Sequence, residues 1–310
     1  MSQNNPLSAI LDKQDFLLLD GAMATELEAR GCNLADSLWS AKVLVENPEL
    51  IREVHLDYYR AGAQCASTAS YQATPAGFAA RDLDEAQSKA LIGKSVELAR
   101  KAREAYLAEN PQAGTLLVAG SVGPYGAYLA DGSEYRGDYQ RSAEEFQAFH
   151  RPRVEALLDA GADLLACETL PNFAEISALA ELLTAYPRAR AWFSFTLRDS
   201  EHLSDGTPLR DVVALLADYP QVVALGINCI ALENTTAALQ HLHGLTALPL
   251  VVYPNSGEQY DAVSKTWHHH GEHCSHLADY LPQWQAAGAR LIGGCCRTTP
   301  KDIAALKARS

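Results

Sequence analysis

Three cysteines follow the apolar segments of the chain, and their spacing favours a metal site. Cys295 and Cys296 come directly after the segment 291–294, and Cys229 follows the apolar segment 222–227. Three thiolates with an open fourth position form a catalytic zinc site rather than a closed structural one. We therefore expect one zinc ion per chain at these three cysteines, with its fourth position left for a substrate thiol.

Two adjacent cysteines can share a metal only if the strand before them has ended, because neighbouring side chains in a strand point to opposite faces. Gly293 and Gly294 predict a turn at this point, since glycine reaches backbone angles that other residues avoid. Two other interpretations stay open. The cysteines could be small buried hydrophobic residues, or Cys295 and Cys296 could form a strained disulfide, which a reducing compartment disfavours.

The composition is that of an ordinary globular protein, with 310 residues, 48% hydrophobic and 20% charged. The net charge of −13, without a basic run, argues against nucleic acid and anionic membranes as partners and suits a monomer. No apolar run reaches the length of a transmembrane helix, and residues 1–6 lack the features of a signal peptide. The seven cysteines indicate a cytoplasmic protein with reduced thiols, in which Cys32, Cys65 and Cys167 are packing residues.

Short apolar segments alternate with amphipathic helices along the whole chain. The predicted strands are 16–19, 64–70, 116–120, 163–167, 191–196, 222–227, 249–253 and 290–292. The predicted helices are 48–61, 83–108, 142–160, 173–185, 208–217, 233–242, 276–287 and one from about 299. Ala-Gly-Ala occurs at 61–63, 160–162 and 287–289, and each time it indicates a helix that ends on glycine just before a strand.

This alternation predicts an α/β protein, a single-domain (β/α)₈ TIM barrel over residues 1–310 with its core at about 15–308. A doubly wound open sheet has the same alternation, but no GxGxxG follows the first strand. Residues 123–139 are expected to form a loop too polar for the core, and 254–273 a polar loop. We interpret the histidines at 268–270 and 273 as part of a surface loop, with a gating role as the alternative.

Polar residues at the ends of the predicted strands mark the expected active site, because TIM barrels carry their sites at the carboxyl ends of the strands. Asp20 and Glu168 end the first and fourth strands. Two carboxylates beside a metal could bind an amino group or act as acid and base. The alternative is that each carboxylate caps a helix or holds a loop.

A zinc ion with three thiolates is electron-rich and suits the activation of a thiol better than that of a carbonyl. A thiol with a pKa near 8.5 is deprotonated when zinc binds it. The thiolate can then attack a methyl group on a cationic sulfonium or ammonium. The neutral thioether product is a weaker ligand and leaves, so catalysis would depend on positioning and thiolate activation.

Four segments, 20–22, 167–169, 226–229 and 293–296, together resemble the homocysteine S-methyltransferases, and the resemblance extends over about residues 15–308. It implies a zinc-dependent barrel that methylates L-homocysteine to methionine. The zinc ligands it implies are Cys229, Cys295 and Cys296. Asp20 and Glu168 would bind the ammonium of homocysteine, the backbone at Gly21 and Ala22 together with Ser67 would bind its carboxylate, and Asn228 belongs to the same expected set. Ser67 stands where many members have threonine.

The methyl donor is indicated by two further segments, 71–74 and 253–258, together with Trp267. They resemble the branch that uses S-methylmethionine, with S-adenosylmethionine as a second donor. Tyr71, Tyr253 and Trp267 could make cation–π contacts to the sulfonium, or they could simply pack. The chain is too short to carry folate and cobalamin domains as well.

Two other functional classes remain open from the sequence. One is a zinc-dependent barrel hydrolase or aldolase, although such sites usually use histidine and carboxylate ligands, and no histidine ends a predicted strand here. The other is a non-enzymatic thiol and zinc redox sensor.

Overall fold

The computed structural model describes residues 5–34, 40–256, 258–261, 266–269 and 276–309, and within them eight parallel strands form a barrel. Around the barrel the strands follow the order β1-β12-β9-β8-β5-β4-β3-β2, and a bridge between Leu19 and Cys65 joins β1 to β2 and closes it. The strands are β1 (Leu17–Leu18), β2 (Cys65–Ser67), β3 (Leu117–Val122), β4 (Leu164–Leu170), β5 (Ala191–Phe195), β8 (Val222–Asn228), β9 (Leu250–Tyr253) and β12 (Ala289–Ile292). The predicted TIM barrel is confirmed.

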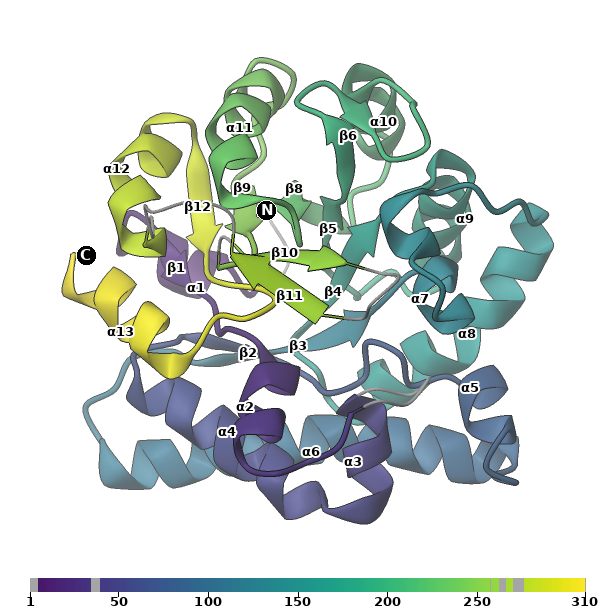
Figure 1. The fold of residues 1–310 in the computed structure, drawn as a ribbon, viewed down its shortest axis with the longest axis vertical. Coiled ribbons are helices and arrows are strands. Elements are labelled where there is room, and N and C mark those ends of the chain that lie inside the picture. The colour runs from purple at the N-terminus through teal and green to yellow at the C-terminus, as the bar shows by residue number, and fades with distance from the viewer. Residues whose placement is uncertain (1–4, 35–39, 257, 262–265, 270–275, 310) are drawn as a thin grey trace.

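One helix follows each barrel strand, and these helices form the outer layer (Figure 1). They are α4 (Pro48–Arg60), α6 (Glu85–Glu109), α8 (Ala143–Asp159), α9 (Phe173–Leu183), α10 (Leu209–Leu216), α11 (Thr235–His243), α12 (Leu277–Ala286) and α13 (Pro300–Ala308). Ser142 and Glu145 form the capping box that starts α8. Gly62, Gly161 and Gly288 have φ of 107°, 86° and 87° just after three helices, so the predicted glycine stops are confirmed.

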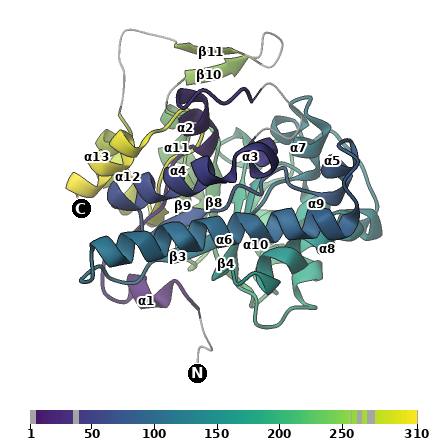
Figure 2. The same ribbon diagram turned by 90° about the horizontal axis from the view of Figure 1, so that it is seen from below.

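Short elements complete the described chain, and several lie at the carboxyl end of the barrel. They are α1 (Ser8–Leu11), α2 (Met23–Ala29), α3 (Ser40–Glu46), α5 (Pro75–Ala79), α7 (Tyr125–Leu129), η1 (Ser133–Tyr135), η2 (Leu232–Asn234), and two hairpins made by β6 (Leu197–Asp199) with β7 (His202–Leu203) and by β10 (Glu258–Asp261) with β11 (Thr266–His269). At the opposite end, α1 closes the barrel (Figure 2), and Leu7 and Ile10 pack against its interior.

Two sequence predictions about loops were wrong. Residues 123–139 were expected to be too polar for the core, but they fold into α7 and η1, with Ser133 and Glu134 buried. The chain packs tightly here, because a Cβ on Gly126 would lie 2.7 Å from the Glu134 nitrogen. Residues 254–273 were expected to be a loop, but they include the β10–β11 hairpin, which crosses the carboxyl end of the barrel (Figures 1 and 2). His268 and His269 belong to β11, and residues 270–275 lie outside the described residues.

Three further sequence predictions concern the other cysteines, the end of the fourth predicted strand and membrane-spanning helices. Cys65 and Cys167 are buried, and the half-buried Cys32 packs against the core, so their interpretation as packing residues is confirmed. The strand predicted to end at Cys167 continues to Leu170, with a register shift against β5 between these two residues. No helix in the described part of the chain is long and apolar enough to cross a membrane.

Candidate metal centre and substrate pocket

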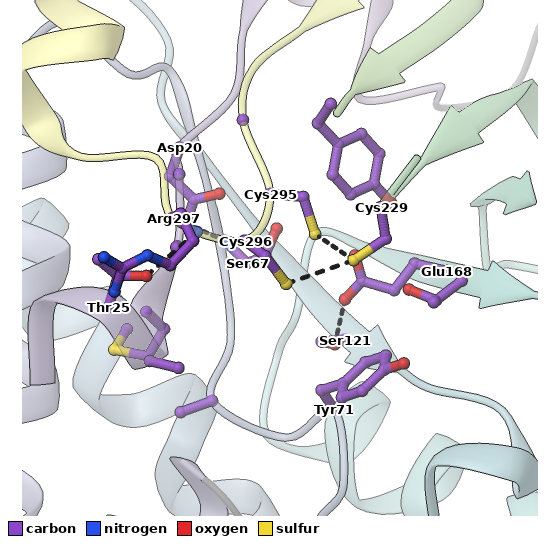
Figure 3. A pocket seen from close by; sticks show the side chains of 18 of the residues that line it. Asp20, Thr25, Ser67, Tyr71, Ser121, Glu168, Cys229, Cys295, Cys296 and Arg297 are labelled. Carbon is purple, nitrogen blue, oxygen red and sulfur yellow. Dashed lines mark hydrogen bonds between the residues drawn. The ribbon is translucent and has the colours of Figure 1, made fainter. Parts of the chain in front are cut away.

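The three predicted cysteine ligands lie together at the carboxyl end of the barrel (Figure 3). The Sγ atom of Cys229 lies 2.9 Å from that of Cys295 and 3.5 Å from that of Cys296, and all three atoms fall within 4.8 Å of one another. The thiols are free, with no disulfide between Cys295 and Cys296. Sulfurs bound tetrahedrally to zinc at about 2.3 Å lie about 3.8 Å apart. A small outward movement therefore makes this arrangement fit a metal ion.

The strand before the adjacent cysteines ends at Ile292, as the metal-site interpretation required. The Gly293 N–H donates to the Val252 carbonyl, at 3.0 Å, and the Gly294 N–H donates to the Asp20 carbonyl, at 3.1 Å. The reason predicted for the glycines was wrong, because neither has a φ in the left-handed region. A Cβ would instead lie 2.6 Å from Leu19 Cβ at position 293 and 2.4 Å from Thr298 Oγ1 at position 294. Close packing requires glycine here.

Three residues beside the pocket have a backbone conformation that non-glycine residues rarely adopt. Thr169, Cys229 and Arg297 have φ of 59°, 55° and 65°. Such a conformation costs about 1–3 kcal/mol per residue and persists where the surroundings enforce it. At Cys229 the N–H donates to the Tyr253 carbonyl, at 3.1 Å, which holds the bend that turns its thiol away from the line of β8. The strain therefore directs one candidate metal ligand towards the other two.

An open pocket of about 1030 Å³, including the space at its mouth, borders the three cysteines. Nearly all of the predicted site residues line it: Asp20, Gly21, Ala22, Ser67, Tyr71, Glu168, Cys229, Tyr253, Cys295 and Cys296. For Trp267 only the backbone is described, in β11, where it pairs with Tyr260.

Asn228 was expected to contact substrate, but the structure places it behind the pocket wall. It is fully buried, and its Oδ1 accepts from the Thr169 N–H, at 2.8 Å, and from the Ser194 hydroxyl, at 2.7 Å. Its Nδ2 donates to Thr169 Oγ1, at 2.8 Å, and lies 4.0 Å from the Cys295 sulfur. These hydrogen bonds hold the strained turn after Glu168, and they occupy the Asn228 amide group with protein partners.

Asp20 and Glu168 are both buried at the pocket wall and have hydrogen-bond donors of their own. Asp20 Oδ2 accepts from the Ser67 N–H, at 2.8 Å, and Glu168 accepts from the Ser121 hydroxyl (Figure 3). Burial raises the pKa of Asp20 to about 8 and that of Glu168 to about 7. Among the described residues that line this pocket, Arg297 is the one with a cationic side chain. The wall therefore favours a ligand that carries positive charge.

The backbone groups expected to bind a carboxylate already have partners. The Ala22 N–H donates to Thr298 Oγ1, at 3.1 Å, and the Ser67 N–H donates to Asp20. A Cβ on Gly21 would lie 2.8 Å from the same Thr298 oxygen, so glycine is required for this close approach. A carboxylate bound here would have to exchange partners with these groups.

Sequence reasoning missed two residues of the pocket, Glu134 and Tyr135. The Tyr135 hydroxyl lies 3.7 Å from the Cys229 sulfur, and Glu134 lines the same pocket and is 6% exposed. Burial raises the pKa of Glu134 to about 7. The signal that could have found them is topological, because their loop follows a barrel strand and so lies at the same end as the cysteines.

The chain is similar to proteins of one family over nearly its whole length. Residues 17–310 match the family model described as homocysteine S-methyltransferase. A homocysteine S-methyltransferase of Escherichia coli K12 is 94% identical, with 100% of both chains covered, and YbgG of Bacillus subtilis, with the same description, is 53% identical over 96% of each chain. The crystal structure of the Escherichia coli homocysteine methyltransferase MmuM in its metallated form superposes with a TM-score of 0.92 at 89% identity, and the match covers 99% of this chain and 100% of that one.

These matches agree with the geometry of the pocket and set aside the hydrolase, aldolase and redox-sensor alternatives. A metal-binding group of three cysteines lies beside a pocket whose wall is acidic. The chain is an enzyme that transfers a methyl group to the thiol of homocysteine, and it belongs to the homocysteine S-methyltransferase family.

Proposed function

We propose that this enzyme holds one zinc ion at Cys229, Cys295 and Cys296 and methylates L-homocysteine to methionine with S-methylmethionine, or S-adenosylmethionine, as the donor. The observation that carries the proposal is the convergence of three free thiols at the wall of an acidic pocket. Three sulfur ligands suit zinc, and the metal would have an open side towards the pocket.

Asp20 and Glu168 bind the ammonium group of homocysteine in this proposal. Both are buried carboxyls on the pocket wall, and the positive charge of the ligand favours their ionised form. Bound zinc would supply a sulfur-binding position at which the homocysteine thiol is a thiolate at neutral pH. The two carboxylates then fix the direction from which the substrate sulfur approaches the donor.

Methyl transfer is a substitution in line at the donor methyl carbon. A bond forms from the homocysteine sulfur to that carbon, and the bond from the carbon to the donor sulfonium breaks, with its electron pair going to the donor sulfur. From S-methylmethionine, both products are methionine. The proton of the homocysteine thiol is lost to solvent when the thiol binds, so no side chain has to accept a proton during the transfer of the methyl group.

Tyr71 and Tyr253 are the aromatic residues that we propose for the donor side, with Trp267 as a third. Both tyrosines line the pocket. The Tyr253 hydroxyl is bonded to Ser194 Oγ, at 2.6 Å, and accepts from Trp192 Nε1, at 3.0 Å, so its ring has a fixed orientation. A fixed ring is suited to hold a sulfonium methyl in position for transfer.

The test measures methionine formed from homocysteine with each donor in turn, and the metal content of the same sample. We expect about one zinc per chain and turnover with S-methylmethionine. Cys295→Ala should lose the metal and lower activity more than about a hundredfold, because two ligands remain. Cys167→Ala, a buried cysteine away from the cluster, is the control and should keep both. Full activity without zinc would contradict the proposal.

We further propose that the enzyme acts as a monomer in the cytoplasm. The net charge of −13 and the free thiols of the described cysteines support this. Sedimentation at micromolar concentration should give a mass near 33.5 kDa. A stable dimer under these conditions would contradict the monomer.

A further inference from the structure

Glu134 is a buried carboxyl group in the pocket, and none of the described cationic side chains is hydrogen-bonded to it. It is 6% exposed and lines the same pocket as the three cysteines. Its Oε2 atom is buried and has no hydrogen-bond partner among the residues that the structure describes. A buried polar atom without a partner is unfavourable and rare in folded proteins. In the wall of an open pocket, it indicates a ligand group that completes it.

The backbone holds Glu134 in this position firmly. The Thr196 hydroxyl donates to the Glu134 carbonyl, at 2.8 Å, and the tight approach to Gly126 leaves no room for a side chain there. Arg136, two residues away, does not pair with the carboxylate. It is exposed and is bonded to Asp138, to the Asp131 carbonyl and to Ser133. The carboxylate is therefore placed by the fold and is not paired with this arginine.

Glu134 also comes from a different part of the fold than the carboxylates proposed for homocysteine. Asp20 and Glu168 come from the ends of β1 and β4, and each has a donor from a neighbouring strand. Glu134 comes from the β3–α8 loop, next to Tyr135, whose hydroxyl lies 3.7 Å from the Cys229 sulfur. The pKa of the Tyr71 hydroxyl is raised first by burial and then by the charge of Glu134. The Glu134 carboxylate is therefore near Tyr71, one of the aromatic residues proposed for the donor.

We propose that Glu134 binds the methyl donor through the α-ammonium group of its amino-acid end. This inference rests on the proposed sulfonium donors, both of which carry such a group. The ammonium is a better partner than the sulfonium, because the sulfonium charge disappears during transfer. A carboxylate on the sulfonium would stabilise the ground state more than the transition state and would slow the reaction. A contact to the permanent charge of the ammonium stabilises both states equally.

The test is Glu134→Gln, which keeps the size of the side chain and removes its charge. Steady-state rates are measured with S-methylmethionine varied at saturating homocysteine, and then the reverse. We expect the donor KM to rise about tenfold or more, because a charge-assisted hydrogen bond is lost. We expect kcat to stay within about threefold, as for an interaction made equally in both states. The homocysteine KM should stay within about twofold.

The matched control is Glu28→Gln, which removes an exposed carboxylate from the same pocket wall. Its donor KM should stay within about twofold, since solvent screens exposed charges. The inference is overturned if Glu134→Gln leaves the donor KM unchanged, raises the homocysteine KM equally, or lowers kcat instead.

Failure of the donor assignment is visible separately, because wild-type protein would then make no methionine from either sulfonium. Metal content and the thermal midpoint of Glu134→Gln report on folding. If that variant does not fold, Glu134→Asp provides the second measurement. Aspartate keeps the negative charge, but its side chain is shorter by one methylene, so the donor KM should rise by a smaller factor than in Glu134→Gln. A wild-type donor KM in Glu134→Asp would also overturn the inference.

Discussion

The buried carboxyl groups of the described residues lie in two regions of the molecule, and their partners differ. The pocket carboxylates, Asp20, Glu134 and Glu168, line the cavity beside the cysteines. The interhelical cluster consists of Tyr139, His150, Arg153 and Glu175, which link α8, α9 and the β3–α8 loop. In the cluster, His150 Nε2 lies 2.7 Å from Glu175 Oε1, and Arg153 Nη2 lies 3.0 Å from His150 Nδ1.

The difference is one of charge compensation. In the interhelical cluster a carboxylate, a guanidinium, an imidazole and a phenol are hydrogen-bonded in a chain inside the protein, so their interactions contribute to holding the fold. The pocket carboxylates accept hydrogen bonds from neutral donors or from none described, and their charge is left for a cationic ligand. Buried charge therefore indicates a binding site where the protein itself does not neutralise it.

The two regions are also connected mechanically. Arg153 donates to the carbonyls of Tyr71 and Gly123, at 2.6 Å in each case. Tyr71 lines the pocket, so the cluster fixes the backbone of one pocket wall. The paired region thus positions part of the region that binds ligand.

The largest effect should come from breaking the interhelical cluster. Arg153→Met leaves Glu175 without a countercharge and two buried carbonyls without a donor, so the free energy of unfolding should fall by about 3–5 kcal/mol. Urea unfolding measures it. Arg60→Ala, which breaks an exposed pair with Glu109, is the control and should leave the urea midpoint near that of the wild type. A loss below about 1 kcal/mol in Arg153→Met would remove the structural distinction between the two regions.

Glu168→Gln should weaken homocysteine binding with little effect on the fold. Loss of a charge-assisted hydrogen bond to the ammonium corresponds to about 1.5–3 kcal/mol, a rise in the homocysteine KM of about 10- to 150-fold. Initial rates with each substrate varied separate this pattern from the donor pattern expected for Glu134→Gln. An equal rise in both KM values would mean that the pocket has no separate sides for the two substrates.

Asp20 should make stability depend on pH. Burial raises its pKa from 3.8 to about 8, so between these values the folded state keeps a proton that the unfolded state has lost. Its contribution to stability is therefore present at low pH and is lost as pH rises towards 8, on the order of 1 kcal/mol per pH unit in this range. Urea unfolding of metal-loaded protein at pH 6 and pH 8 measures this, with Asp20→Asn as the reference. Parallel behaviour of the two proteins would show that Asp20 is ionised throughout.

The smallest effect should come from Ser67→Thr. The donor to Asp20 is the Ser67 backbone N–H, which the substitution keeps, and threonine keeps the hydroxyl. The homocysteine KM should stay within about twofold, as measured from initial rates. A tenfold rise would show that the added methyl group occupies space that the substrate needs.

The barrel and the cysteine cluster at its carboxyl end could be predicted from the sequence because their signals are local. A buried parallel strand is a short apolar run, and each helix begins and ends with caps a few residues apart. The first polar residues after such runs must lie at one end of the barrel, and this is how Asp20, Glu168 and the three cysteines were found. The distances between their sulfurs still required the bend at Cys229 and the close packing at Gly293 and Gly294.

Only the tertiary structure determined which polar residues are buried and with which partners. Glu134 and Tyr135 are in a polar segment that local patterns assign to a surface loop, and they reach the pocket because the segment packs against Gly126 and Thr196. Arg153 and Glu175 have the charge of surface helix residues in the sequence. Burial of a charge depends on partners that distant elements bring to it, and periodicity along the chain carries no information about those partners.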